Sequence, residues 1–301
     1  MSLIAFVLIV ASAILHAAWN LLAKKNRMTA PFYALISSMG ALAWFHVQFW
    51  TPVNMAALPG TFWAFLFSSI AFDLLYCWGL IRTYRTMEMA TAYPVMRALP
   101  ILLTALATTM FGLGTPLSTM AKFGMLVVFA GCMFMPLLKF SDCRISDYFN
   151  KSMLFVLAVA CGTTGYTIFD SQAQKIMVQT AAQVSKPVLS MTYYSTRSLL
   201  LASSLWLIVL TTDGNRAVLR DYWRKHNFTP ILAGVFASST YILVLLAMNY
   251  VTNVSYVQVF RQLGLPVGLA AGTFFLKERC TPTKCFGVAL ILLGLGVSLV
   301  H

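Results

Sequence analysis

Five ionisable side chains lie inside long runs of apolar residues: Asp73, Arg97, Asp170, Arg197 and Arg261. A charge at the centre of a membrane-spanning helix costs roughly 2.5–3.5 kcal/mol on insertion scales, so each is a candidate functional residue. The rest of the sequence has no Gly-rich phosphate loop, no HExxH motif and no carboxylate pair at catalytic spacing. The four histidines and six cysteines show no metal-ligand spacing. We therefore expect no enzyme activity, no cofactor and no metal.

Arg97 and Arg261 are the strongest candidates for binding a substrate. A guanidinium group offers a planar fork of donors that fits a carboxylate or a phosphate. Tyr93 lies four residues before Arg97 and Gln258 three before Arg261, so each arginine has a polar neighbour on its own helix face. Both segments contain prolines that should interrupt the helix and free backbone groups, namely Pro94, Pro100 and Pro266. Alternatively, both arginines hydrogen-bond to carbonyls as packing elements.

The remaining three ionisable residues allow two interpretations each. A buried carboxylate can be neutralised near physiological pH, so Asp170 or Asp73 could couple transport to protons. Asp73 could instead neutralise an arginine as a buried ion pair. Arg197 follows Tyr193 and Tyr194 by four and three residues, so it could bind substrate or be held structurally on that helix face.

The composition indicates that membrane-spanning helices position these residues. Of 301 residues, 59% are hydrophobic and 10% are charged, against about 25% charged in a soluble protein. A membrane-spanning helix needs about 20 apolar residues, so ten would use nearly the whole chain. We expect an all-α membrane protein whose helices cover residues 3–23, 30–50, 59–81, 88–111, 117–138, 151–174, 188–211, 229–250, 254–276 and 281–300.

The basic residues alternate between connections. Odd-numbered connections carry 15 Lys and Arg, whereas even-numbered connections and the termini carry only Lys175 and Lys186. Short basic loops remain in the cytoplasm. We expect odd-numbered loops in the cytoplasm and both termini outside. This bias accounts for the net charge of +13, so no nucleic acid partner is expected.

The sequence also contains a weak internal repeat. Aligning residues 11–25 with 161–175 places Asn20 on Asp170, and aligning 96–99 with 260–263 places Arg97 on Arg261. Each unit would hold five helices, in residues 1–140 and 151–301. Because five is odd, the second unit enters the membrane inverted, as in secondary transporters whose site lies between the repeats. The fold class is therefore ten transmembrane helices in two inverted five-helix repeats around a central cavity.

The repeat also places polar side chains on matching helix faces. His16 and Asn20 lie one turn apart in the first helix, and Tyr166 and Asp170 lie one turn apart in the sixth. Polar side chains that face lipid have no hydrogen-bond partner, so these helix faces should line the cavity. Aromatic neighbours could enclose an apolar or cationic part of a substrate; these are Trp19, Tyr93 and Tyr166.

Several motifs resemble the drug/metabolite transporter superfamily, in its ten-helix form built from two EamA-like units. The family's motif for the last two helices is matched by Pro266, Leu276-Lys277-Glu278-Arg279, Gly287, Ala289-Leu290-Ile291 and Gly294. Its motif for the first helix is matched by residues 16–20, His-Ala-Ala-Trp-Asn. One departure is Gly112-Leu113-Gly114, where members often place an acidic residue before helix five. The resemblance implies export or exchange of amino acids or related metabolites across the cell (inner) membrane, by a monomer or a homodimer.

Three intramembrane arginines against two aspartates favour a substrate with an anionic group. We therefore expect a secondary transporter of an amphoteric metabolite or an organic anion. Two alternatives remain, namely a flippase for lipid or lipid-linked headgroups and an intramembrane enzyme. The second is disfavoured because no nucleophile, base or metal set is assembled.

Overall fold

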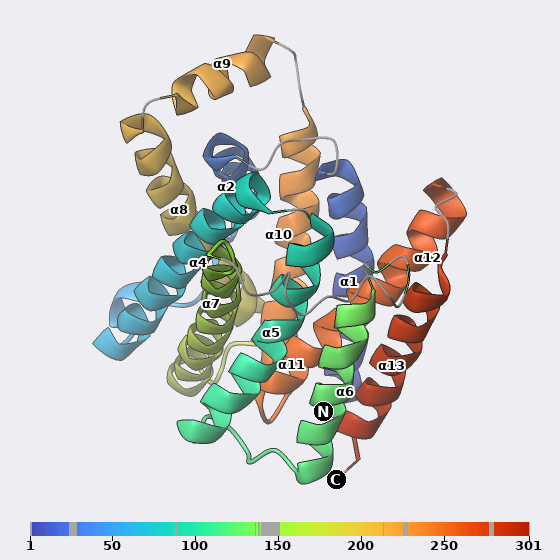
Figure 1. The fold of residues 1–301 in the computed structure, drawn as a ribbon. Coiled ribbons are helices and arrows are strands. Elements are labelled where there is room, and N and C mark those ends of the chain that lie inside the picture. The colour runs from blue at the N-terminus through green and yellow to red at the C-terminus, as the bar shows by residue number, and fades with distance from the viewer. Residues whose placement is uncertain are drawn as a thin grey trace.

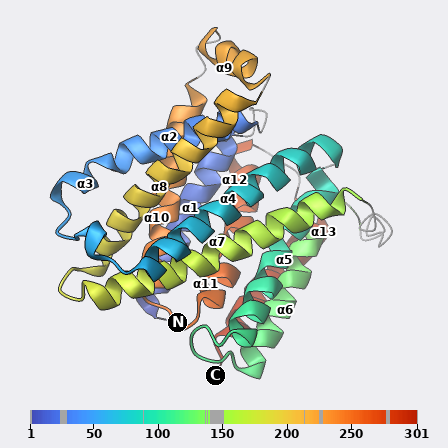
Figure 2. The same ribbon diagram turned by 90° about the vertical axis from the view of Figure 1, so that its left-hand side faces the viewer.

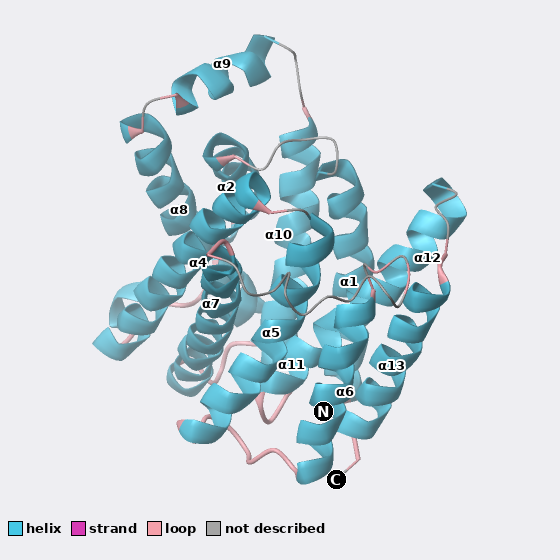
Figure 3. Ribbon diagram, viewed as in Figure 1, coloured by secondary structure: helices cyan, strands magenta, loops and turns pink. Residues whose placement is uncertain are grey.

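The computed structural model describes residues 2–23, 29–87, 89–135, 137, 139, 151–212, 214–224, 228–276 and 280–300. These residues form helices and connecting loops without a strand (Figure 3). The first helices are α1 (Leu3–Ala23), α2 (Ala30–Phe45), α3 (Val47–Trp50), η1 (Met55–Ala57), α4 (Gly60–Thr86), α5 (Met89–Met110) and α6 (Thr119–Phe134). They are followed by α7 (Met153–Thr180), α8 (Lys186–Thr211), α9 (Asn215–Arg224), α10 (Thr229–Met248), α11 (Val254–Phe260), η4 (Arg261–Leu263), α12 (Gly264–Leu276) and α13 (Pro282–Ser298).

Several helices have the length and composition of membrane spans. In the described part of the chain, six segments are long and apolar enough to cross a bilayer: 30–50, 60–86, 92–110, 153–180, 186–211 and 229–248. Shorter apolar helices cover 3–16, 119–134 and 282–298. Large apolar side chains also point outward, among them Leu3, Phe49 and Phe274, which are 77%, 78% and 81% exposed. These features indicate a membrane-embedded protein.

Polar residues mark where several helices begin. The Thr29 side chain accepts a hydrogen bond from the backbone N–H of Phe32 at 3.3 Å, and Ser118 accepts one from Ala121 at 3.1 Å. Each satisfies one of the N–H groups that the first turn of a helix leaves without a partner. Helix occupies all ten of the ranges expected from the sequence, with ends that differ by several residues.

The effect of the prolines differs from the expectation. Residues 89–110 form one continuous helix, α5, although Pro94 and Pro100 lie inside it, so the expected interruption is absent. The segment 254–276 is interrupted, at the 3-10 turn η4 and not at Pro266 itself. A proline ring clashes with the carbonyl four residues earlier, which here belongs to Gln262 inside η4. Arg261 therefore lies at a break in its helix, and Arg97 does not.

Helix α9 was not expected. It has exposed arginines spaced four residues apart, at Arg216, Arg220 and Arg224, while Tyr222 on another face stacks on Phe32 of α2 with ring centroids 6.3 Å apart. A basic amphipathic helix of this kind lies at a surface and does not cross a membrane. Figures 1 and 2 show α9 at one end of the bundle, joining α8 to α10.

The main helix contacts join elements far apart in the chain. Helix α4 packs along α7, α1 along α10, α2 along α8 and α6 along α13 (Figures 1 and 2). The α6–α13 crossing is close because a Cβ added at Gly124 would lie 2.6 Å from the carbonyl oxygen of Gly294. The start of α1 and the end of α13 lie at the same end of the bundle, opposite α9 (Figure 1).

Candidate functional site

A cavity of about 100 Å³ lies where α1, α2, α4, α5, α7 and the broken segment α11–η4 meet. This volume is enough for several water molecules or a small polar group. Its wall is mainly aromatic and polar. The tyrosine, arginine and other polar side chains that line it are His16, Tyr33, Tyr76, Tyr84, Tyr93, Arg97, Thr163, Tyr166, Gln258, Arg261 and Gln262.

Arg97 and Arg261 supply the positive charge of this cavity. The Nη2 of Arg97 donates a hydrogen bond to the backbone oxygen of Arg261 at 3.3 Å, so the two residues lie close together. The Nε of Arg97 and the Nη1 of Arg261 are buried and have no hydrogen-bond partner. In the described part of the chain, neither guanidinium is paired with a carboxylate. A buried donor without a partner is costly, so these atoms are suited to receive a ligand.

The broken segment supplies acceptors beside these donors. Gln258 in α11 and Gln262 in η4 are 3% and 1% exposed, and the Oε1 of each has no hydrogen-bond partner. The Nε2 of Gln262 donates to the backbone oxygen of Gln258 at 3.2 Å, which directs its amide. The cavity wall therefore presents unpaired cationic donors and unpaired neutral acceptors. A ligand that carries both an anionic group and a donor group would satisfy both sets.

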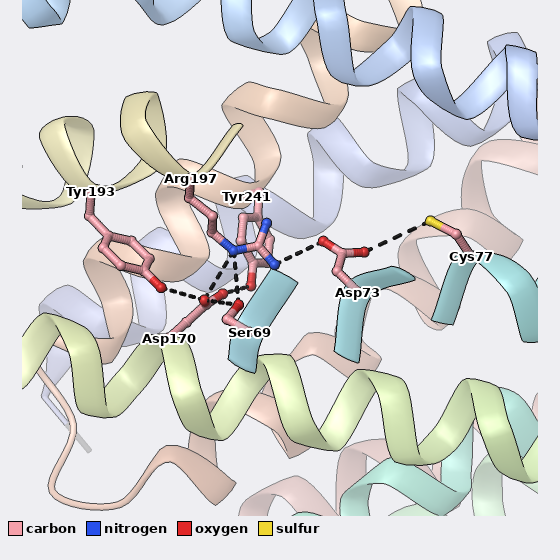
Figure 4. Close-up of polar contacts among 7 residues, drawn as sticks. All are labelled: Ser69, Asp73, Cys77, Asp170, Tyr193, Arg197 and Tyr241. Carbon is pink, nitrogen blue, oxygen red and sulfur yellow. Dashed lines mark hydrogen bonds and ion pairs between the residues drawn. The ribbon is translucent and has the colours of Figure 1, made fainter. Parts of the chain in front are cut away.

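A second group of polar residues lies between α4, α7, α8 and α10 (Figure 4). Arg197 of α8 donates from Nη2 to Asp73 of α4 at 2.8 Å and from Nε to Asp170 of α7 at 3.0 Å. Arg197 is 2% exposed. Of the two interpretations that the sequence left open for Asp73, the ion pair with an arginine is therefore present.

Asp170 also accepts three hydroxyl hydrogen bonds. Tyr193 donates to its Oδ1 at 2.6 Å, Ser69 donates to the same oxygen, and Tyr241 of α10 donates to Oδ2. Four helices thus meet at one carboxylate, which is fully buried. Breaking such a pair by removing one partner is strongly destabilising, so the network holds α4, α7, α8 and α10 in register.

Aromatic rings in edge-to-face contact lie between the network and the cavity. The Arg197 guanidinium lies 5.2 Å from the ring centre of Tyr241 and 5.9 Å from that of Tyr166. Tyr166 in turn contacts Tyr76 edge to face, with ring centroids 6.0 Å apart. Because Tyr166 and Tyr76 both line the cavity, a change of charge in the network acts on the cavity across one layer of aromatic side chains.

The residues expected from the sequence therefore separate into two places. Five of them line the cavity: Tyr93, Arg97, Tyr166, Gln258 and Arg261. Asp170, Arg197 and Asp73 form the buried network and do not line it. Trp19 and Asn20 lie in α1, and their side chains are outside the described residues.

Several cavity residues were not expected as site residues from the sequence, among them Tyr33, Tyr76, Tyr84 and Gln262. The signal that could have found them is chemical. Each carries a hydroxyl or amide within a run of apolar residues, where such a group needs a partner. His16, which the repeat aligns with Tyr166, also lines the cavity.

The fold resembles that of a solved protein. A structure described only as "Crystal structure of protein" superposes with a TM-score of 0.67, at 14% sequence identity, over 99% of this chain and 96% of that one. The similarity at this identity concerns the fold alone. No family model matches the chain, and no curated protein matches it.

Proposed function

We propose that this chain is a secondary transporter of a small polar metabolite that carries an anionic group. The observation that carries the proposal is the pair of guanidinium groups, Arg97 and Arg261, which present unpartnered buried N–H groups to one cavity without a carboxylate beside them in the described residues. A carboxylate or phosphate would provide both the missing hydrogen bonds and the missing charge. Among the described residues that line the cavity, no assembled nucleophile and base accompany these arginines, which favours movement of the ligand over its conversion.

The remaining cavity wall supports an amphoteric substrate over a purely anionic one. The free Oε1 atoms of Gln258 and Gln262 can accept from an ammonium or hydroxyl group. Tyrosine ring faces at 33, 76, 84, 93 and 166 can bind the cationic or apolar remainder of the molecule. Amino acids and related metabolites have this combination of groups.

We further propose that the architecture is an inverted repeat of residues 1–140 and 151–301, with ten spans. The helix pairs support this, because exchanging the two units converts the α1–α10 pair into the α7–α4 pair. The close glycine contacts between α6 and α13 are also related by exchange of the two units. A Cβ at Gly124 would meet the Gly294 oxygen at 2.6 Å, and one at Gly131 would meet the Gly287 oxygen at 2.8 Å. The sequence aligns Gly124 with Gly287 and Gly131 with Gly294, so the exchange converts one contact into the other.

With these features we propose membership of the ten-helix drug/metabolite transporters and a place in the cell (inner) membrane. The alternating basic connections favour cytoplasmic odd-numbered loops and external termini. The exposed arginines of α9 belong to one of those loops, where positive charge would face the cytoplasmic surface.

The test combines ligand binding with a matched set of arginine variants. A panel of amino acids and organic anions is first screened for thermal stabilisation of the purified protein, because a ligand that binds only the folded state raises its stability. Arg97→Lys and Arg261→Lys are then compared with Arg220→Lys, which changes an exposed arginine of α9. We expect the first two to lose at least tenfold in affinity with little change in melting temperature, since lysine cannot form the bidentate contact.

Unchanged affinity with a lowered melting temperature in both cavity variants would make the arginines structural and contradict the proposal. Transport is then measured in proteoliposomes with the ligand from the screen. Accumulation of the soluble ligand supports a transporter. Movement of labelled lipid without uptake of soluble ligand would support a flippase instead.

A further inference from the structure

The buried network does not balance its own charge. It holds two carboxylates, Asp73 and Asp170, against one guanidinium, Arg197 (Figure 4). With both carboxyl groups ionised, the network carries one excess negative charge in a largely buried place. An uncompensated charge in such a place is costly, and a proton on one carboxylate removes it.

The two carboxylates differ in how well they can take that proton. Asp170 already accepts from Arg197 and from three hydroxyl groups, and its side chain has no exposed surface. A proton on either oxygen would turn an acceptor into a donor and break at least one of these bonds. Asp170 is therefore the less suitable of the two carboxylates for taking up a proton.

Asp73 has an oxygen that is nearly free. Its Oδ2 accepts from Arg197, whereas its Oδ1 faces only the Cys77 thiol, a weak donor, at 4.0 Å. The Asp73 side chain is 16% exposed, against none for Asp170. A proton on Oδ1 can therefore be added from outside the network and leaves the bond from Arg197 to Oδ2 in place.

The groups that face Asp73 come from every helix packed around it. They are Tyr76 and Cys77 on α4, Tyr33 on α2, Asp170 on α7, and Tyr194 and Arg197 on α8. Of these, Arg197 is the one cation and Asp170 the one other carboxylate. Tyr33 and Tyr76 both line the cavity, so Asp73 lies directly behind its wall.

We propose that Asp73, and not Asp170, is the proton-binding site of the transporter proposed above. A proton from water adds to a lone pair of Asp73 Oδ1, and the charge of the network changes from one excess negative charge to none. The proposed function adds a consequence. An anion bound at Arg97 and Arg261 removes positive charge from the cavity wall, so the anion and the proton favour each other's binding.

The proton can be observed without any substrate. Difference infrared spectroscopy of the protein in liposomes, recorded as the pH is lowered, detects the C=O stretch of a protonated carboxyl group. The chain has only eight Asp and Glu residues, so few bands compete. We expect a band from a buried carboxylic acid that is lost in Asp73→Asn and unchanged in Asp221→Asn, which alters an exposed aspartate of α9.

If the asparagine variant is unstable, conservative variants identify the residue that binds the proton. Asp73→Glu should keep the band and shift its frequency, because the protonated group itself has changed, whereas Asp170→Glu should leave the frequency unaltered. A band that persists in Asp73→Asn, or that moves in Asp170→Glu, would overturn the assignment. Because the measurement uses protons alone, its failure would leave the arginine binding test intact, and failure of that test would leave this one intact.

Discussion

At the scale of single residues, Arg197 is the side chain that joins the two carboxylates of the buried network. It contacts the carboxylates of two other helices and lies against the rings of Tyr166 and Tyr241. Without it, Asp73 and Asp170 would be two like charges in a buried site. Removing one partner of a buried ion pair is much more harmful than removing the pair, because the remaining charge keeps its desolvation cost.

Arg197→Met should therefore destabilise the protein by about 3–5 kcal/mol. Tyr193→Phe should cost less, about 1–3 kcal/mol, because Asp170 then loses one of its four donors. The measurement is denaturant unfolding in one detergent, with Arg220→Met as the exposed control. If Arg197→Met unfolded at the same denaturant concentration as Arg220→Met, the network would have no structural role.

The sequence singled out five charged residues in the apolar runs, because a charge far from the end of such a run is conspicuous. It could not decide their partners. Asp73 and Arg197 are 124 residues apart, and which of them meet depends on how α4 and α8 are aligned along their axes. Three tyrosines of the cavity, Tyr33, Tyr76 and Tyr84, were not singled out for a related reason, since an aromatic residue in an apolar run is equally consistent with packing.

At the scale of helices, the crossing of α6 and α13 depends on glycine. A Cβ at Gly294 would lie 2.6 Å from the Gly124 oxygen and 2.7 Å from the backbone nitrogen of Val128. Backbone atoms cannot move aside as a flexible side chain can. The two helices would have to separate to admit one methyl group, and small residues at helix crossings in membranes allow this closeness.

Gly294→Ala and Gly296→Ala form a matched pair on one helix. Gly296 has nothing within 4 Å of its Cβ position, so its substitution should stabilise α13 by about 0.5–1 kcal/mol through lower chain entropy. Gly294→Ala should instead lower the melting temperature by several degrees. Equal melting temperatures for the two variants would show that the α6–α13 crossing has room for a methyl group at residue 294.

Helix positions were predictable because apolar length is a strong signal, whereas their internal irregularities were not. Prolines inside α5 leave the helix continuous, and the break in the segment 254–276 falls at η4, before Pro266. Neighbouring helices decide whether the freed backbone groups are covered. Helix α9 was not predicted because the expected helices were apolar runs of about 20 residues, whereas α9 has ten residues and is polar.

At the scale of the whole molecule, the ends of the chain and α9 lie at opposite ends of the bundle (Figure 1). The basic residues of the loop that contains α9 favour the cytoplasm for that end. The chain should therefore begin and finish on the other side of the membrane. This arrangement requires an even number of spans, as ten would provide.

A reporter that is active only outside the cytoplasm should be active when fused after residue 301. The same reporter inserted at Gly214, which has a positive φ of 85° and open space around it, should be inactive. A cytoplasmic reporter at the two positions should give the opposite pattern. Activity of one reporter at both positions would refute the odd number of spans expected between residue 214 and the end of the chain, and the reversed pattern would overturn the orientation.

The two guanidinium groups of the cavity, which have no carboxylate partner among the described residues, also have an electrical consequence. Carrying one elementary charge through a membrane potential of 100 mV involves about 2.3 kcal/mol. The empty cavity wall holds two uncompensated charges, at Arg97 and Arg261, and a bound carboxylate reduces them to one. If the anion binds without a proton, any rearrangement that shifts this wall within the field therefore responds more strongly to voltage when the cavity is empty than when it is loaded. A proton bound at Asp73 together with the anion would instead leave the combined charge of wall and network unchanged. In the proposed transporter, the resting potential of the cell would then help to set the direction of net movement when no proton accompanies the anion.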